Sequence, residues 1–313
     1  MKDEPVRSRV VVFGSLNMDL VVRVPRMPLP GETLAGRSFC TYAGGKGANQ
    51  AVACARQGTP VEMVGRVGDD VFGQDLCVEL VRQTVAIDGV KKVAGERTGV
   101  AIIYVDDSAQ NCIAIVPGAN GQVGIGDAEA LRSRLRDAGM LLLQLEVPID
   151  AVLRAAVVAR EAACKVLLNL TPVPAHPIPD ALWPLLDILV VNESEAGTLT
   201  GLASVTRDNA SEAALLLRQR GPDDVLVTLG EHGVVWSSAQ GAQHFQAFPV
   251  QPVDTTAAGD TFVGALAAML VAERGMPEAI QYAMRAAAIC VTRPGAQASI
   301  PSRQEVEAFV FVD

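Results

Sequence analysis

Apolar segments of strand length alternate with stretches of helical periodicity from residue 127 onward, and this alternation constrains the fold more than any other feature. Strand–helix–strand repeats place consecutive strands parallel in one sheet and cover both of its faces with helices. The predicted helices span 127–137, 149–163 and 207–220, and the predicted strands span 140–145, 165–170, 188–191 and 225–229. The sequence therefore predicts an α/β fold of three layers, helix–sheet–helix, built on a mostly parallel sheet.

Two stretches in the first third of the chain have a different character. Residues 19–42 alternate between apolar and polar positions on either side of a turn-rich segment, and the segments 99–105 and 111–116 form a second such pair. Alternation with a period of two favours antiparallel strands with one exposed face. We therefore predict a small β-sheet lid in two pieces, 17–43 and 97–119, inserted into an α/β core made of 1–16, 44–96 and 120–313.

The bulk composition limits the class of protein and its partners. Half of the residues are hydrophobic and 19% are charged, which allows a sizeable buried core. A net charge of -9 argues against nucleic acid or an anionic membrane as the main partner. Neither a signal peptide nor a transmembrane span is predicted, so a cytoplasmic protein is expected. The six cysteines lack any Cys-x-x-Cys pair and are expected to be buried thiols rather than disulfides or zinc ligands: Cys40, Cys54, Cys77, Cys112, Cys164 and Cys290.

The segment 254–262, Asp-Thr-Thr-Ala-Ala-Gly-Asp-Thr-Phe, precedes an apolar run of helical character. This places Ala258, Gly259 and Asp260 in the first turn of a helix, where backbone N–H groups have no partner within the helix. Such a turn binds anions, and a carboxylate fixed in it can take a proton from a hydroxyl that attacks a phosphate. The simpler interpretation is an ordinary helix capped by Thr255 or Thr256.

A second glycine-rich segment, 44–50, has the sequence Gly-Gly-Lys-Gly-Ala-Asn-Gln and lacks the spacing of a phosphate loop or a dinucleotide fingerprint. Its glycines allow a small ligand to approach the backbone, and Lys46 and Asn49 offer donors to hydroxyl groups. Asn17 and Asp19 alternate along an extended segment, so both face one side. A carboxylate suits a vicinal diol because it accepts from two adjacent hydroxyls; alternatively, Asp19 only solvates an edge of the lid.

These segments, in this order, resemble the signatures of the ribokinase (phosphofructokinase-B type) family of carbohydrate kinases, from about Val10 to Phe309. The resemblance implies a ribokinase-like core with a β-sheet lid, Asp260 as the catalytic base, and an anion hole formed by the amides of Ala257, Ala258, Gly259 and Asp260. The sugar-binding positions that it implies are Asn17, Asp19, Gly44, Gly45, Lys46, Asn49, Glu146 and Asp260. The nucleotide-binding positions that it implies are Asn192, Thr228, Leu229, Gly230, Glu231, Gly233 and Gly259.

The resemblance also implies ATP as the phosphoryl donor and two kinds of cation. Mg²⁺ is expected near Glu195, which acts directly or through water, and a monovalent cation such as K⁺ is expected beside the anion-hole loop. The ligands implied for the monovalent cation are the side chains of Asp254 and Ser299 and the carbonyl groups of Thr256, Cys290, Arg293 and Gly295. Pairing of two lids into a homodimer is a further expectation from the family.

The reaction expected from the resemblance is transfer of the γ-phosphoryl group of ATP to the 5-hydroxyl of D-ribose. A sister kinase that acts on 2-deoxyribose, a ketosugar acid or a nucleoside would share the residues of the ATP side. From a different class, a non-catalytic sugar-binding regulator would have the same fold. The intact Asp260 and Asn192 favour a kinase, because a sensor has no need of a base.

Overall fold

The computed structural model describes residues 7–108 and 110–310, and its centre is one nine-stranded sheet. The strand order across this sheet is β13-β12-β11-β10-β9-β8-β1-β4-β5. All neighbouring strands are parallel except β12 and β13, which are antiparallel to their neighbours at one edge. In chain order, the strands are β1 (Arg9–Phe13), β4 (Val61–Gly68), β5 (Ala86–Val93), β8 (Ala138–Leu143), β9 (Lys165–Asn169), β10 (Ile188–Asn192), β11 (Asp224–Thr228), β12 (Val234–Ser238) and β13 (Gly241–Phe245). This confirms the mostly parallel sheet.

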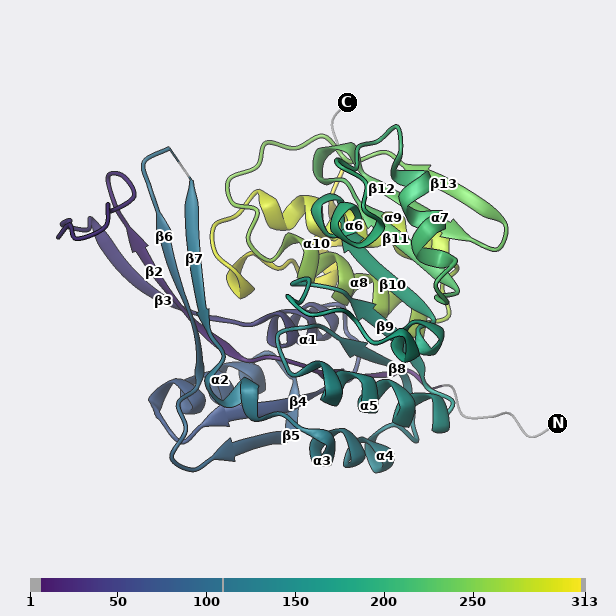
Figure 1. Ribbon diagram of the computed structural model, residues 1–313, viewed down its shortest axis with the longest axis horizontal. Helices are drawn as coiled ribbons and strands as arrows, with labels where there is room; N and C mark the ends of the chain where they lie inside the picture. The colour runs from purple at the N-terminus through teal and green to yellow at the C-terminus, as the bar shows by residue number, and fades with distance from the viewer. Residues whose placement is uncertain (1–6, 109, 311–313) are drawn as a thin grey trace.

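Helices cover both faces of the sheet, which gives the three predicted layers (Figure 1). One face carries α1 (Lys46–Arg56), α2 (Val71–Arg82), α8 (Ala258–Val271) and α9 (Met276–Val291), with α10 (Arg303–Ala308) packed against α9. The other face carries α3 (Ile125–Glu129), α4 (Leu131–Arg134), α5 (Ile149–Glu161), α6 (Glu193–Thr200) and α7 (Ala210–Arg218). Short 3₁₀ turns are η1 (Gly118–Gln122), η2 (Asp180–Leu185), η3 (Gly230–His232) and η4 (Gln297–Ser299).

The central strand β1 shows why its sequence is a continuous apolar run. Val10 and Val12 point into the core on the α1/α8 side, while Val11 and Phe13 point into the core on the α5 side. All four side chains are fully buried. A parallel strand between two helical layers has no solvated face, so alternation of apolar and polar residues disappears.

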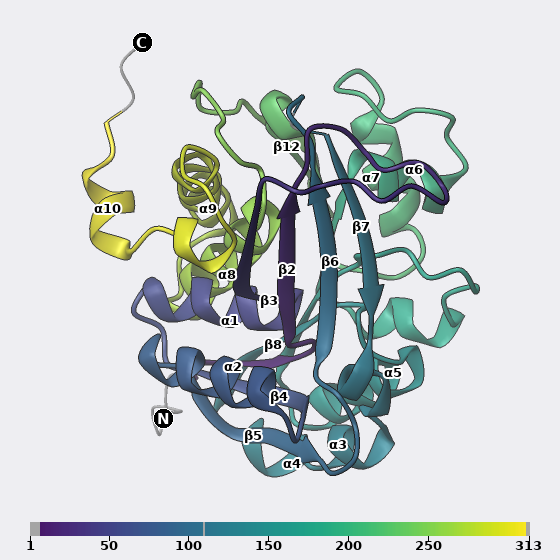
Figure 2. The ribbon, with the colours of Figure 1, turned by 90° about the vertical axis from the view of Figure 1, so that its left-hand side faces the viewer.

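A second sheet of four strands stands apart from the core and faces the viewer in Figure 2. It consists of β2 (Asn17–Arg23), β3 (Ser38–Gly44), β6 (Gly99–Val105) and β7 (Asn111–Val116), in the order β3-β2-β6-β7. The two outer pairs are antiparallel, as expected, but the central pair β2–β6 is parallel. The sheet joins two chain segments that are far apart in sequence, which agrees with a lid made in two pieces.

Three details differ from the predictions. The expected helix 127–137 is two short helices, α3 and α4, which bury Ala128, Leu131 and Leu135 with the same spacing that one helix would have. Strand β5 was not predicted, because on this edge strand only Gly89 is buried and no apolar run results. Cys40 and Cys112 are exposed on the second sheet, although all six cysteines are free, as expected.

In the part of the chain that the structure describes, no helix is both long enough and apolar enough to cross a bilayer.

Candidate active site

Two adjoining cavities lie where the parallel strands end at their carboxyl termini. Strands β9, β10 and β11 finish on Asn169, Asn192 and Thr228, and each of these residues lines the first cavity, of ≈ 230 Å³. The second cavity, of ≈ 710 Å³, shares Thr228, Thr255, Ala258 and Gly259 with the first. Ligands of open α/β sheets bind at this rim, so the cavities occupy the place that the topology predicts.

The first turn of α8 separates the two cavities. Ala257 precedes the helix in the left-handed conformation, with φ 59°, which is strained for a residue with a side chain. The N–H of Ala258 donates to the carbonyl of Thr255 at 3.2 Å. Among the described residues, the N–H groups of Gly259 and Asp260 have no acceptor, and a methyl group added at Gly259 would meet no atom within 4 Å. This open helix N-terminus is suited to an anion.

Both carboxylate oxygens of Asp260 are held by amide groups from α1. Asn49 Nδ2 donates to Oδ2 at 3.0 Å, and Gln50 Nε2 donates to Oδ1 at 3.1 Å. The two helices approach closely at Gly264, one turn further along α8, where an added Cβ would lie 2.4 Å from the Cβ of Ala53. The sequence motifs 44–50 and 254–262, about two hundred residues apart, therefore meet through the contact between α1 and α8.

Asp19 belongs to strand β2 of the second sheet, and its carboxylate lies against Gly44 of the neighbouring strand β3. A Cβ at position 44 would lie 2.3 Å from Asp19 Oδ2, so only glycine leaves room for this side chain. Burial, followed by the charges of the nearby carboxylates of Glu146 and Asp260, raises the pKa of Asp19 to about 7, although Lys46 opposes the shift. Asp19 is thus a buried carboxyl group close to the catalytic rim and not a solvated edge residue.

Glu146 follows strand β8 and is fixed by three donors. Its Oε2 accepts from Ser15 Oγ at 2.6 Å, from the N–H of Lys46 at 3.1 Å and from Asn17 Nδ2 at 3.4 Å. The fixed carboxylate is positioned to accept from a ligand hydroxyl through its other oxygen.

The Lys46 side chain lines the first cavity among acidic groups. Burial alone would lower its pKa, but the charges of Asp260, Glu146, Glu195 and Asp19 outweigh this and raise the pKa. Lys46 is therefore a fixed positive charge within an acidic site, and it can neutralise an incoming phosphate.

Asn192 and Glu195 form a capping box at the start of α6. Asn192 Oδ1 accepts from the N–H of Glu195 at 2.8 Å, and Glu195 Oε2 accepts from the N–H of Asn192 at 2.8 Å. Both residues line the first cavity together with Asp260. Capping of the helix is by itself a sufficient reason for Asn and Glu at these two positions. It also fixes two oxygen-bearing side chains in the cavity that the first turn of α8 lines.

The second cavity is lined largely by apolar side chains. Thr228, Gly230, Glu231 and Gly233 of the predicted nucleotide-binding turn line it, but Leu229 is 1% exposed and packs in the core instead. The rest of the wall is mainly apolar and includes Phe248, Pro249, Val250, Phe262, Met284 and Val291. A mostly apolar cavity of ≈ 710 Å³ next to an open helix N-terminus has the size and polarity suited to a nucleoside phosphate.

The residues implied for the monovalent cation also come together. Asp254 accepts from the N–H groups of Thr256 and Gly295, both at 2.9 Å, and these bonds lower its pKa against the opposing effect of burial. Cys290 Sγ lies 3.0 Å from Ser299 Oγ and 3.7 Å from the carbonyl oxygen of Thr256. Groups of three or more His, Cys, Asp or Glu side chains that could hold a metal are absent among the described residues.

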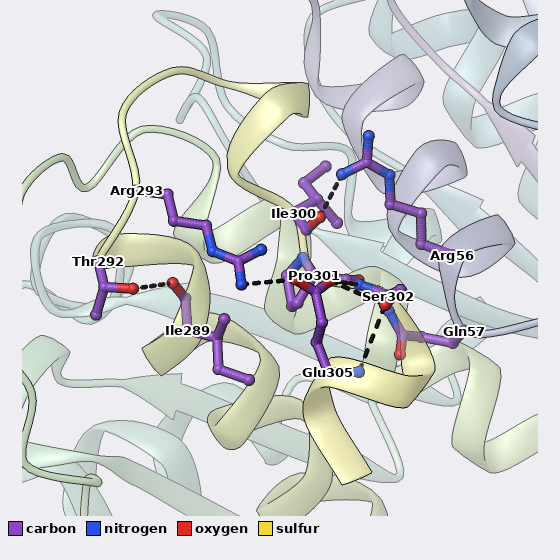
Figure 3. A network of polar contacts seen from close by, with 9 residues as sticks. All are labelled: Arg56, Gln57, Ile289, Thr292, Arg293, Ile300, Pro301, Ser302 and Glu305. Atoms are coloured by element: carbon purple, nitrogen blue, oxygen red, sulfur yellow. Dashed lines mark hydrogen bonds and ion pairs between the residues drawn. The ribbon is translucent and has the colours of Figure 1, made fainter. Parts of the chain in front are cut away.

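A polar network holds in place the segment that carries Gly295 and Ser299 (Figure 3). Arg293 Nη2 pairs with Glu305 at 2.7 Å, and Arg56 and Gln57 at the end of α1 donate to the carbonyls of Ile300 and Pro301. The segment that carries Gly295 and Ser299 is thereby anchored to α10 and to α1.

Comparison with known proteins identifies the family of the chain. The model of the pfkB family of carbohydrate kinases matches residues 7–303. The chain belongs to the pfkB family of carbohydrate kinases. It is 39% identical over 305 residues to the ribokinase of Haemophilus influenzae, covering 97% of this chain and 99% of that one. It is 35% identical to the deoxyribokinase of Salmonella typhi over 97% and 99% of the two chains.

Among solved structures, the ribokinase of Arabidopsis thaliana complexed with ribose and ATP superimposes with a TM-score of 0.87 and is 36% identical. The superposition covers 96% of this chain and 97% of that one. The three-layer core with a separate small sheet is therefore the ribokinase-like fold that the sequence predicted.

Sequence reasoning assigned no specific role in this pfkB-family site to five residues that line it or bond its side chains: Ser15, Gln50, Asn120, Thr171 and Thr255. Asn169, which lies at a strand end, was marked only as one of several polar residues on the ligand-binding rim, and Gln50 lies inside the glycine-rich motif. Asn120 carries no such signal. It bonds the backbone of Leu16 and Asn17 Oδ1 at 2.8 Å, and only the fold brings it there.

Proposed function

We propose that the protein phosphorylates D-ribose at O5 with ATP, giving D-ribose 5-phosphate. The observation that carries the proposal is the position of Asp260, whose two oxygens are held by α1 while its helix presents open N–H groups to both cavities. A fixed base next to an anion-binding turn supplies what phosphoryl transfer requires, namely alignment and stabilisation of charge.

The sugar is expected to lie between the second sheet and α1, with O5 directed at Asp260. Asp19 and Glu146 then accept hydrogen bonds from ring hydroxyls, and Asn17, Lys46 and Asn49 complete the contacts. Asp260 takes the proton from O5 as O5 attacks the γ-phosphorus, and the bond from the γ-phosphorus to the β–γ bridging oxygen breaks so that ADP leaves. The names of the Haemophilus and Arabidopsis relatives support D-ribose as the acceptor, and the deoxyribokinase relative makes 2-deoxyribose the main alternative.

The nucleotide is expected to place its base in the apolar second cavity and its phosphates over the first turn of α8. Thr228, Gly230 and Gly233 lie along this path, and Gly259 stands at the junction of the two cavities. The amides of Gly259 and Asp260, with that of Ala257, stabilise the charge that develops on the transferred phosphoryl group.

Two cations complete the proposal. Glu195 and Asn192 present oxygen atoms to the first cavity and suit Mg²⁺ that keeps part of its water shell, which would neutralise the phosphates. The oxygens of Asp254, Thr256 and Ser299, with the nearby carbonyls of Arg293 and Gly295, suit a monovalent cation. Such an ion would stiffen the loop that carries Ala257.

The second sheet, in the segments 17–43 and 97–119, is proposed to act as a lid on the sugar site. Its outer strands carry exposed apolar side chains: Phe39, Ile113, Ile115 and Val116. Open edges and apolar surface of this kind favour association, so pairing of two lids into a homodimer is part of the proposal. Six free thiols agree with a reducing, cytoplasmic location.

The test is a coupled assay of ADP release with a panel of pentoses, hexoses and nucleosides. D-ribose should give the highest kcat/KM, and Asp260→Asn should lower kcat by about 10²–10⁴-fold, the range expected for a lost general base. Binding of ATP to this variant should change little, since the amides remain. Turnover of Asp260→Asn close to that of the parent would refute the role of Asp260, and preference for another sugar would refute the assignment of the substrate.

A further inference from the structure

Gln50 is buried at the centre of a chain of side-chain amides that ends on the proposed base. It has no exposed surface and lines neither cavity. Its Nε2 donates to Asp260 Oδ1 at 3.1 Å and to Asn169 Oδ1 at 3.0 Å. Its Oε1 accepts from Gln144 Nε2 at 2.6 Å. A ligand in the cavities therefore has no direct route to Gln50, and any effect of Gln50 on the reaction passes through its neighbours.

The partners of Gln50 determine which way its amide group points. With the group reversed, Oε1 would face the oxygens of Asp260 and Asn169, and the NH₂ group would face the NH₂ group of Gln144. All three contacts would then be repulsive, so the orientation is settled by the network. Asn169 is itself held, since its Nδ2 donates to the carbonyl of Val190 at 3.3 Å.

The other donor to the base differs from Gln50 in one respect. Asn49 also bonds Asp260, but it belongs to the proposed sugar contacts and can exchange this bond for one to the substrate. Gln50 has no such second task, because it is fully enclosed. Its bond to Oδ1 is therefore the one that persists when a sugar enters.

We propose that Gln50 is a positioning residue for Asp260, with Gln144 as its support, and that this pair keeps the carboxylate aimed at the acceptor hydroxyl. The inference rests on the proposed function and extends it to residues that do not touch the substrate. Misalignment of a reacting group by about 1 Å can cost about 10²-fold in rate, so removal of Gln50 should act on kcat.

The experiment compares Gln50→Met with Gln144→Met in the full-length protein. Gln50→Met should lower kcat by about 10–100-fold and leave the KM values for ATP and sugar within about threefold. Gln144→Met should lower kcat less, and the double variant should be no slower than Gln50→Met, because Gln144 acts through Gln50. Circular dichroism and thermal melting of each variant establish that the fold is retained.

A matched control is Gln83→Met, at the end of α2. Gln83 is half-buried and also makes two side-chain hydrogen bonds, to Glu79 Oε1 at 2.7 Å and from Arg56 Nε at 3.0 Å, but it bonds none of the residues proposed to hold the sugar, the nucleotide or the cations. Its kcat should stay within about twofold of the parent. An equal loss of kcat in Gln83→Met would show that replacing any hydrogen-bonded glutamine lowers kcat through stability alone, and would overturn the proposal.

The decisive comparison repeats Gln50→Met in the Asp260→Asn background, with single-turnover kinetics to reach low rates. If Gln50 acts through the carboxylate, the residual rate should change by less than about twofold. The same 10–100-fold drop in this background, or a kcat within about threefold of the parent in the single variant, would overturn the proposal. If the parent phosphorylates another sugar but not D-ribose, only the substrate assignment fails, and the comparison is run with that sugar; a parent inactive on every sugar overturns both.

Discussion

Asp19 makes a prediction that can be checked without any substrate, by replacing it with asparagine. Burial is the main cause that raises the pKa of this carboxyl group from 3.8 to about 7 in the folded protein, followed by the charges of Glu146 and Asp260. A folded-state pKa above the unfolded value means that the folded protein binds the proton more tightly. The resulting stabilisation is complete below pH 3.8 and is lost as the pH rises through 7.

The magnitude follows from that pKa value. The stabilisation, RT ln(1 + 10^(7 − pH)), falls from about 1.4 kcal/mol at pH 6 to about 0.1 kcal/mol or less at pH 8. Asparagine has nearly the same shape as aspartate but does not titrate, so the Asp19→Asn variant does not lose this stabilisation as the pH rises. The free energy of unfolding of the variant, relative to the parent, should therefore increase by about 1.4 kcal/mol between pH 6 and pH 8.

The assay is equilibrium unfolding in urea of both proteins at pH 6, 7 and 8, at constant ionic strength and without sugar. Only the difference between the two proteins is used, because the contributions of groups remote from Asp19 then cancel. As a control, Asp106→Asn on an exposed turn should show no such trend, since the pKa of Asp106 is lowered by hydrogen bonds from Ser108 and Gln110. A difference between parent and Asp19→Asn that stays constant from pH 6 to pH 8 would refute the raised pKa of Asp19.

Three further predictions concern the reaction. Gly259→Ala should leave thermal stability unchanged or slightly higher, because the added methyl group would lie in open space. The same substitution should lower kcat/KM for ATP at least about tenfold, because the methyl group would obstruct the anion-binding turn. An unchanged kcat/KM would show that phosphate does not approach there. Activity in potassium should exceed activity in lithium at equal ionic strength, and Asp254→Ala should remove the difference and any rise in melting temperature that potassium causes. D-ribose should be preferred over 2-deoxyribose by about tenfold or more, and Asp19→Ala should erase most of that preference, because an unpaired buried acceptor costs about 1–3 kcal/mol; a parent that prefers 2-deoxyribose contradicts this assignment.

The extent to which the sequence predicted the structure depends on how local each signal is. The parallel core strands were readable because a strand buried on both faces is a continuous apolar run, as in Val10–Phe13. The edge strand β5 has a single buried residue and left no such signal. The parallel pairing of β2 with β6 joins residues about eighty positions apart, and nothing in either strand specifies its partner.

The site shows the same division between local and non-local information. Asp260, Gly259 and Asn192 were predictable because a helix start with small or capping residues is a local pattern. Asn120 was missed because its hydrogen bonds form only where η1 meets the loop before β2. Asparagine is also common in turns because it tolerates their backbone conformations, so its presence in a turn does not indicate a functional role. The role of Gln50 was hidden for a related reason, since a glutamine in a helix becomes informative only when its buried partners are known.

Helix α1 links the separate parts of the proposed site to one rigid element. Its first turns supply Lys46, Asn49 and Gln50, which contact the acidic cluster and the base, and its end anchors the segment near the proposed cation through Gln57 (Figure 3). Because a helix moves as a unit, Asp260 and the proposed cation loop, which are both held by α1, keep their relative positions even if the second sheet moves. The proposed sugar contacts are divided differently: Asp19 and Asn17 belong to strand β2 of the second sheet, whereas Glu146 and Asn49 belong to the core. If the second sheet moves as the proposed lid, its movement would change how the sugar is held without disturbing the alignment of Asp260, and closure would then be a step in binding rather than in the preparation of the base.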